Sequence, residues 1–207
     1  MMKWIVFFLS FLAIGCSTKK RTIEYSTQLE IFRTNYKAGF LEDPRSPLTN
    51  EDLPYLDFYV ADPAWNIECN CTPATMAKPF EMPTYSGVTR TYIHQYTATC
   101  KKGDKTIELK LYKNIHHPIN PMYKNNLFLP FKDFTNGETT YGGGRYINLM
   151  TTDIIKGKIN IDFNTCYNPW CAYSDGFNCP IPPKDNHLSF EVLAGEKKFT
   201  GDYKSKK

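Results

Sequence analysis

Short runs of alternating aromatic, β-branched and polar residues constrain the fold of this chain more than any other feature. The runs are too short for helices and are rich in Tyr, Phe, Ile and Thr, as β-strands are. We expect strands at residues 56–60, 67–71, 91–100, 107–112, 127–131, 145–149, 159–163 and 188–193. Lys102-Gly103-Asp104 joins two of these runs and predicts a hairpin turn. Because helices do not alternate with the strands and 14 prolines are present, we expect an antiparallel β-sandwich or barrel.

One helix is expected ahead of the strands. Apolar residues recur there at mostly helical spacing among polar ones, at Ile23, Leu29, Phe32, Tyr36 and Phe40. Gly39 is a candidate for the residue that ends this helix. The sequence therefore predicts a mainly β domain with one N-terminal amphipathic helix.

The N-terminus resembles the signal of a bacterial lipoprotein. A short basic start is followed by an apolar run from Trp4 to Ile14, which is too short to span a bilayer and long enough for a signal peptide. The run ends in Gly15-Cys16, which is similar to a lipobox although Ala13 stands where Leu is usual. The resemblance implies cleavage before Cys16 and lipidation of its thiol. Ser17, in place of Asp, favours an outer-membrane location facing the periplasm.

Charge is concentrated at the two ends of the chain. The formal net charge is +4, yet residues 22–196 hold 16 basic and 20 acidic side chains. A mildly acidic body is unlike a nucleic-acid-binding protein, which presents a basic face to phosphates. We expect a signal peptide at 1–15, a lipidated cysteine and short basic tether at 16–22, one globular domain at 23–200 and a basic tail at 201–207.

Three dense blocks of aromatic, polar and proline residues lie in the second half of the chain. The first contains Leu127-Phe128-Leu129-Pro130-Phe131-Lys132-Asp133 and Gly144-Arg145-Tyr146. The second contains Asp162-Phe163-Asn164 and Tyr167-Asn168-Pro169-Trp170, and the third contains Cys179-Pro180-Ile181-Pro182-Pro183 and Ala194-Gly195-Glu196-Lys197. Together these blocks resemble the family called domain of unknown function 1684. This family has no established activity, so the resemblance implies a shared fold and site region without naming a reaction.

Six cysteines remain once Cys16 is set aside, and an oxidising compartment would allow up to three disulfides. Cys69 and Cys71 share one face of a strand, so Cys100 is a candidate partner for either. A Cys171–Cys179 disulfide would close a loop between two signature blocks. The alternatives are a zinc site or a nucleophile pair built from Cys171, Cys179 and His187, although their spacing matches no standard zinc pattern.

Polar signature residues near strand ends are the candidate ligand-binding set. They are Lys132, Asp133, Arg145, Asp162, Asn164, Asn168 and Glu196. In a shared pocket, Asp162 and Glu196 could act as general acid and base, and Arg145 could bind an anionic group bidentately. The alternative is a structural role, in which these side chains hold the long loops through hydrogen bonds.

The functional expectation follows from these candidates. We expect a lipid-anchored envelope protein that binds a small ligand or an envelope partner through loops 132–146 and 162–187. A hydrolase-like enzyme with a carboxylate or cysteine–histidine site in the same region is the alternative. The sequence indicates no cofactor, no metal and no nucleic-acid partner.

Overall fold

The computed structural model describes residues 13–115 and 124–205, with side chains from residue 23 onward. Most of the expected signal peptide and the side chain of Cys16 therefore lie outside the described residues. Within the described part, no helix is long and apolar enough to cross a membrane.

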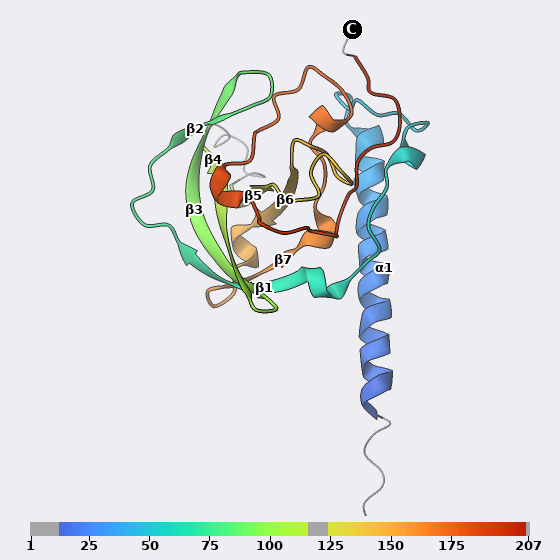
Figure 1. Ribbon diagram of the computed structural model, residues 1–207, viewed down its shortest axis with the longest axis vertical. Helices are drawn as coiled ribbons and strands as arrows, with labels where there is room; N and C mark the ends of the chain where they lie inside the picture. Colours follow the sequence, from blue (N-terminus) through green and yellow to red (C-terminus); the bar gives the residue numbers. More distant parts are fainter. Residues whose placement is uncertain (1–12, 116–123, 206–207) are drawn as a thin grey trace, which may run out of the picture.

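Seven antiparallel strands form one sheet that curls around its core (Figure 1). The strands are β1 (Asn66–Pro73), β2 (Phe80–Pro83), β3 (Thr89–Lys102), β4 (Lys105–Asn114), β5 (Asn126–Phe131), β6 (Arg145–Met150) and β7 (Lys158–Asp162). Their order is β6-β5-β4-β3-β1-β7, and β2 pairs with the outer part of the long strand β3. The mainly β fold, with antiparallel strands and one N-terminal helix, is confirmed.

Aliphatic side chains alternate along the strands and fill the inner face of the sheet. They include Ile67 of β1, Leu109 and Leu111 of β4, Leu129 of β5 and Ile161 of β7, all buried. Because alternate residues of a strand point to opposite faces, the residues between these positions lie on the outer face. A separate aromatic cluster occupies that face, and it contains Met82, Tyr92, Tyr112, Phe80 and Phe128.

Helix α1 (Ala13–Glu42) stands beside the sheet, and its amino-terminal part projects beyond the domain (Figure 1). Its inward face is formed by Tyr25, Leu29, Arg33, Tyr36 and Phe40. The expected amphipathic face was wrong in two places, because Ile23 and Phe32 are exposed.

The predicted end of the helix was also wrong. Gly39 has open space around its Cα and stays helical, while Asp43 N–H donates to Gly39 O at 3.3 Å. The helix ends at Glu42, just before Pro44, whose ring disfavours helical geometry in the preceding residue.

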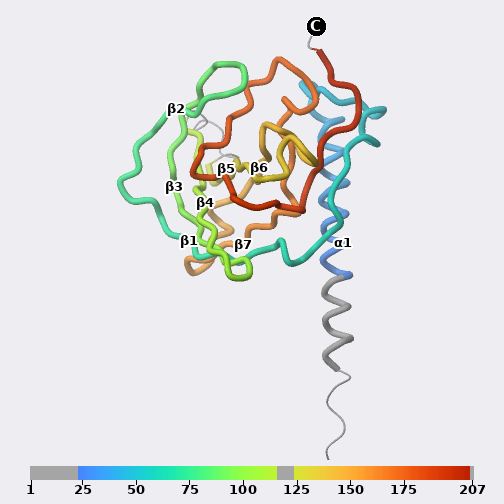
Figure 2. The backbone as a smooth tube through the Cα atoms, viewed as in Figure 1, coloured from blue at the N-terminus to red at the C-terminus, as the bar shows by residue number. Residues whose placement is uncertain are grey.

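Six of the eight predicted strands are confirmed, and so is the hairpin, in which β3 pairs with β4 around Gly103. Residues 56–60 form only one bridge, from Phe58 to Glu196. Residues 188–193 form no strand, because this carboxy-terminal segment crosses the start of β6 and the carbonyl of Val192 accepts from Arg145 (Figure 2). Strand β2 was missed because Pro79 and Pro83 flank it, and an edge strand tolerates proline.

Short 3-10 helices connect the strands and the carboxy-terminal loops. They are η1 (Leu53–Tyr55), η2 (Pro63–Trp65), η4 (Thr151–Asp153), η5 (Phe163–Thr165), η6 (Trp170–Ala172) and η7 (Lys184–Asn186). Asn186 at the end of η7 is fully buried and connects its loop to the sheet. Its Oδ1 accepts from Lys110 N–H, and its Nδ2 donates to Lys110 O and Pro130 O. The carboxy-terminal loops contact both faces of the sheet, since Leu188, Val192 and Ala194 pack into the aliphatic core of the inner face and Pro180 lines the cavity on the outer face.

Candidate functional site

Arg145 and Asp133, two of the predicted site residues, form a fully buried ion pair. Arg145 Nη2 donates to Asp133 Oδ2 at 2.8 Å, and both side chains are 0% exposed. The guanidinium also donates to the carbonyls of Val192 and Ala194, while Asp133 accepts from Thr135 N–H. The two Nη atoms thus have the several partners that a buried charge needs, whereas Arg145 Nε has no hydrogen-bond partner among the described residues. This pair holds the carboxy-terminal segment on β6 and faces no open space.

Glu196, a second candidate, lies in a buried cluster with two tyrosines. Its carboxylate accepts from Tyr173 Oη at 2.6 Å, from Tyr36 Oη at 2.9 Å and from Asn168 N–H at 2.8 Å. Burial raises the pKa of Glu196 to about 7 from its usual 4.5, and the hydrogen bonds from Asn168, Tyr173 and Tyr36 oppose this rise. The Asn168 side-chain amide donates to Lys197 O. The cluster joins α1 to the carboxy-terminal segment.

Asp162 and Asn164 form the third polar group, at the end of β7. Tyr25 of α1 donates its hydroxyl to the Asp162 carboxylate at 2.8 Å, and Asn164 N–H donates to the same carboxylate at 2.9 Å. Asn164 is fully buried and also bonds both the N–H and the carbonyl of Asp62. These contacts fix α1 and the segment ahead of β1 against the end of β7.

The seven predicted site residues therefore do not converge on one pocket, which corrects the sequence interpretation. The carboxylates of Asp133, Asp162 and Glu196 lie in three separate networks. Lys132 belongs to the backbone pairing of its loop, where its N–H donates to Asn186 O and its carbonyl accepts from Leu188 N–H. The arrangement matches the structural alternative, in which polar side chains hold the loops.

Two of the possible disulfides are present. Cys69 pairs with Cys100 directly across β1 and β3, and Cys171 pairs with Cys179, which confirms the expected loop closure. A third disulfide, which six cysteines would allow, does not form, because Cys71 faces Ala98 across the same strands and Cys166 is also a free thiol. Since Cys171 and Cys179 are joined, they supply no thiolate for the zinc or nucleophile alternatives.

The free Cys166 thiol and the potential metal-binding side chains also give no support to the zinc and nucleophile alternatives. Burial raises the pKa of the free Cys166 thiol to about 11, so this cysteine stays protonated at neutral pH. His187 Nε2 lies 3.1 Å from Pro182 O. Among the described residues, no three His, Cys, Asp or Glu side chains are placed to hold a metal ion.

A different candidate site lies on the outer face of the sheet. Strand register places Tyr92 opposite Asn114, Tyr112 opposite Phe128, and Phe128 opposite Asn148. All of these side chains belong to the face opposite the aliphatic core. They line a cavity of about 320 Å³ together with Arg45, Arg90, Lys113, Asn126, Leu127 and Pro180.

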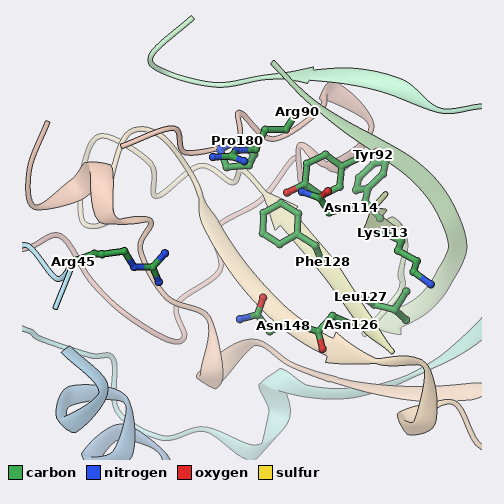
Figure 3. A pocket seen from close by; sticks show the side chains of 11 residues that line it. Arg45, Arg90, Tyr92, Lys113, Asn114, Asn126, Leu127, Phe128, Asn148 and Pro180 are labelled. Carbon is green, nitrogen blue, oxygen red and sulfur yellow. The ribbon is translucent and has the colours of Figure 1, made fainter. Parts of the chain in front are cut away.

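Phe128 lies at the centre of this cavity (Figure 3). Its ring is held by two tyrosines, with centroids 5.6 Å from Tyr92 and 4.8 Å from Tyr146. In Figure 3, Arg90 and Pro180 lie on one side of Phe128, Tyr92 and Asn114 on a second, and Asn126 and Asn148 on a third. The cavity therefore combines an aromatic floor with amide and cationic walls.

Among the described residues, the lining of the cavity includes Arg45, Arg90 and Lys113 and no carboxylate, although the Arg45 guanidinium is paired with Asp43 at 2.7 Å. Strand alternation directs the Lys113 side chain to the face opposite Tyr112 and Asn114, so Arg90 is the cation of this face. Arg90 and Lys113 form no ion pair among the residues whose side chains are described. Burial raises the pKa values of Tyr92 and Tyr112, so both phenols stay neutral at physiological pH. A positive cavity with uncharged aromatic walls is suited to an organic anion.

The wall carrying Pro180 is positioned by several contacts. Tyr85 N–H donates to Cys179 O at 3.1 Å, Ile181 N–H donates to Pro83 O at 2.8 Å, and the Tyr146 hydroxyl donates to Pro180 O. The adjacent Cys171–Cys179 disulfide ties the same segment to η6. The cavity wall is thus fixed by β2, β6 and a covalent bond.

These lining residues were not predicted from the sequence, although the sequence contains a pattern that indicates them. Four strands each carry an aromatic residue two positions from a polar one, on the face opposite the aliphatic residues. The pairs are Arg90 and Tyr92, Tyr112 and Asn114, Asn126 and Phe128, and Tyr146 and Asn148. Repetition of this pair across neighbouring strands indicates a lined surface, whereas isolated aromatics indicate core packing.

Comparisons with known proteins bear on the fold. The family model "Protein of unknown function (DUF1684)" matches residues 51–197. The solution NMR structure of an uncharacterized protein from Haloarcula marismortui is similar, with 32% sequence identity and a TM-score of 0.66. That similarity covers 86% of this chain and 96% of the other. No curated protein matches the chain.

Proposed function

Since the chain belongs to the DUF1684 family, whose description states no activity, we propose a function from the cavity over Phe128. The protein binds a small organic anion with a flat apolar portion. One observation carries this proposal: Arg90 lines the cavity over Phe128 without an ion pair among the described side chains, and the described residues of the lining include no acidic one. Guanidinium groups bind anions with directed hydrogen bonds, and an exposed ring offers a stacking surface.

The three asparagines of the cavity add hydrogen-bonding capacity beside the ring. Strand register places Asn114 opposite Tyr92 and Asn148 opposite Phe128. A carboxamide has two donor hydrogens and an acceptor oxygen, so amides at these positions favour a ligand with polar substituents.

The proposal places recognition on the outer sheet face, with a contribution from loop 162–187 through Pro180. Loop 132–146 contributes to the scaffold through Asp133 and Arg145. The hydrolase-like alternative receives no support from the site, because its carboxylates are engaged by protein groups and its two cysteines are joined.

A matched pair of probes tests the proposal. Naphthalene-1-sulfonate and its neutral sulfonamide share the aromatic rings and differ in charge. We expect the full chain in non-ionic detergent micelles to bind the sulfonate at least about tenfold more tightly by titration calorimetry, because an ionic hydrogen bond contributes about 1.5–3 kcal/mol. Protein-free micelles provide the blank.

Arg90→Ala removes the cation and should abolish the preference for the sulfonate. Lys101→Ala is the matched control, because Lys101 is an exposed cation at the other end of β3. The proposal is wrong if both probes bind equally, if neither binds, or if Arg90→Ala and Lys101→Ala behave alike.

We also propose that Cys16 carries lipid and holds the protein at the outer membrane, facing the periplasm. The support is the apolar run that ends at Gly15-Cys16. Acyl chains contribute about 0.8 kcal/mol per buried methylene, so two or three chains make a stable anchor. The mass of protein purified from its native envelope should show acylation at Cys16. An unmodified N-terminus, or a Cys16→Ser protein that stays in the membrane fraction, would overturn this proposal.

A further inference from the structure

The cavity over Phe128 holds its available positive charge on one side. Arg90 lines it and forms no ion pair with a described side chain. The Arg45 guanidinium is held by the Asp43 carboxylate through two bonds, from Nε to Oδ1 at 3.0 Å and from Nη2 to Oδ2 at 2.7 Å. Lys113 alternates to the other face of β4, and its side chain points away from Phe128 in Figure 3. Among the described side chains, the cavity therefore offers a ligand a single cation.

One cation limits the charge that a ligand can bring into the cavity. A guanidinium presents two parallel N–H donors, which match the two oxygens of a carboxylate. A phosphate monoester carries nearly two negative charges at neutral pH. Its second charge would lie beside Arg90 without a further available cation in the described lining. The site therefore favours a ligand with one negative charge, and a carboxylate has the further advantage that it can lie in the plane of an aromatic ring.

Two amides lie on the side of Phe128 opposite to Arg90 (Figure 3). Asn126 precedes Phe128 by two positions on β5, and Asn148 is the register partner of Phe128 on β6. Strand alternation keeps these three side chains on the same face of the sheet. Because a carboxamide has two donor hydrogens and an acceptor oxygen, it can bond a hydroxyl or an amino group. A ligand that crosses the ring from Arg90 meets hydrogen-bonding groups at its far end.

The Phe128 ring between Arg90 and the amides is a surface for stacking. Its centroid lies 5.6 Å from that of Tyr92, with the planes at 28°, and 4.8 Å from that of Tyr146, with the planes at 74°. These two contacts hold the ring in place. Phe128 is nevertheless only half-buried and lines the cavity, so part of the ring is accessible to a flat ligand.

We propose that the ligand is an aromatic monocarboxylate with a hydrogen-bonding substituent on the edge of the ring opposite its carboxylate. The carboxylate pairs with Arg90, the ring stacks on Phe128, and the substituent bonds the amides of Asn126 and Asn148. This inference rests on the proposed function and specifies the ligand of the same site. The single cation sets the charge of the ligand, and the opposite positions of Arg90 and the amides set where its two polar groups lie.

The first test compares 4-hydroxybenzoate with benzoate, which differ only in the hydroxyl opposite the carboxylate. We expect the full chain in non-ionic detergent micelles to bind 4-hydroxybenzoate about tenfold more tightly by titration calorimetry, because its hydroxyl gains hydrogen bonds to two amides. Protein-free micelles provide the blank. Equal or tighter binding of benzoate overturns the proposal.

Phenyl phosphate tests the charge of the ligand with the same ring. Since the described lining offers one available cation, we expect phenyl phosphate to bind no more tightly than benzoate. Tighter binding of phenyl phosphate would mean that a second cation takes part, and the assignment of a monocarboxylate would be wrong.

Variants of the amides provide the second readout. The double variant Asn126→Leu/Asn148→Leu should bind 4-hydroxybenzoate only as tightly as benzoate, while its affinity for benzoate stays that of the wild type. A merely structural role of the two asparagines would weaken both acids alike and keep the preference. Asn70→Leu is the matched control, because Asn70 is an exposed asparagine of β1 on the same sheet face and outside the described lining of the cavity. The proposal is wrong if the double variant keeps the preference or if Asn70→Leu loses it.

The outcomes separate this inference from the proposed function. Arg90-dependent binding of naphthalene-1-sulfonate without a preference for 4-hydroxybenzoate removes the monocarboxylate ligand and leaves the anion site over Phe128. Failure of naphthalene-1-sulfonate and of both benzoates removes both proposals. A tenfold preference for 4-hydroxybenzoate in the wild type, together with weaker binding of both benzoates in Arg90→Ala, supports both.

Discussion

Arg145 and Arg90 lie on the two faces of the same sheet and illustrate the difference between its two polar regions. Arg145 is fully buried, and its guanidinium is bonded to Asp133 and to loop carbonyls. Arg90 is half-buried, lines the cavity over Phe128 and has no carboxylate partner among the described side chains. A polar side chain whose partners are all supplied by the protein supports the fold. One that lacks such partners beside a cavity has capacity for a ligand.

The largest expected effect tests this comparison directly. Arg145→Met leaves Asp133 buried without its counter-ion, which should cost about 3–5 kcal/mol of unfolding free energy. Arg90→Ala removes no protein partner and should change stability by less than about 0.5 kcal/mol. Urea unfolding followed by circular dichroism measures both.

A double variant checks the cause. Arg145→Met combined with Asp133→Asn leaves no uncompensated buried charge, so it should recover part of the loss. If Arg90→Ala destabilises the protein as much as Arg145→Met does, the distinction between the two faces fails.

The two disulfides provide the next test. Cys69 and Cys100 are 31 residues apart, so removing their bond with serines should cost about 3.5 kcal/mol by loop entropy. Cys171 and Cys179 are 8 residues apart, and their removal should cost about 2.5 kcal/mol. Only the second bond adjoins Pro180 of the cavity wall. We therefore expect probe binding to weaken in Cys171→Ser/Cys179→Ser and to persist in Cys69→Ser/Cys100→Ser. The unfolding free energy should fall more in Cys69→Ser/Cys100→Ser than in Cys171→Ser/Cys179→Ser.

Glu196 gives the buried region a pH dependence. Its pKa in the folded state is about 7, whereas an ordinary glutamate titrates near 4.5. Between these values the folded state binds more protons than the unfolded state, so stability falls as pH rises, by about 3 kcal/mol in total from this group. Glu196→Gln does not titrate. The difference in unfolding free energy between wild type and this variant should change across pH 4.5–7 and be constant below it. A constant difference at every pH would contradict the assignment.

The smallest expected effect concerns α1. Tyr25→Phe removes the hydroxyl that bonds Asp162 and Asn164, and one such bond contributes about 1 kcal/mol. Urea unfolding should show this loss. Thr27→Ala is a control on the exposed face of the same helix, because the Thr27 hydroxyl bonds only its own helix at Ile23 O. Probe binding should be unchanged in both variants, since the described lining of the cavity over Phe128 includes no residue of α1.

Much of the fold could be predicted because strand periodicity is local. The runs that became β1, β3, β4, β5, β6 and β7 alternate in the sequence itself, and Gly103 marks their hairpin. Residues 188–193 have the same alternation and form no strand. The Val192 carbonyl in this segment accepts from Arg145, a partner that lies more than forty positions earlier in the chain and that local periodicity does not reveal.

The candidate site was harder to predict because polar residues of the signature are ambiguous. Asp133, Arg145 and Glu196 are residue types that catalyse and bind, and they are also the types that hold long loops. Only the three-dimensional partners distinguish the two roles, and these partners include Val192 O and the hydroxyls of Tyr36 and Tyr173. The cavity depends on register between four strands, which sets Phe128 opposite both Tyr112 and Asn148.

The length of α1 determines where a ligand would meet the protein. The helix extends from Ala13 to Glu42, and Arg45 follows three residues after its end. With a rise of 1.5 Å per residue, the helical segment from Cys16 to Glu42 is about 40 Å long. A lipid at Cys16 would therefore be separated from the start of the Arg45 loop by about the thickness of a whole bilayer. If Cys16 carries lipid and the helix stands upright on the membrane, the cavity over Phe128 samples solutes of the surrounding aqueous space rather than the headgroups of that membrane.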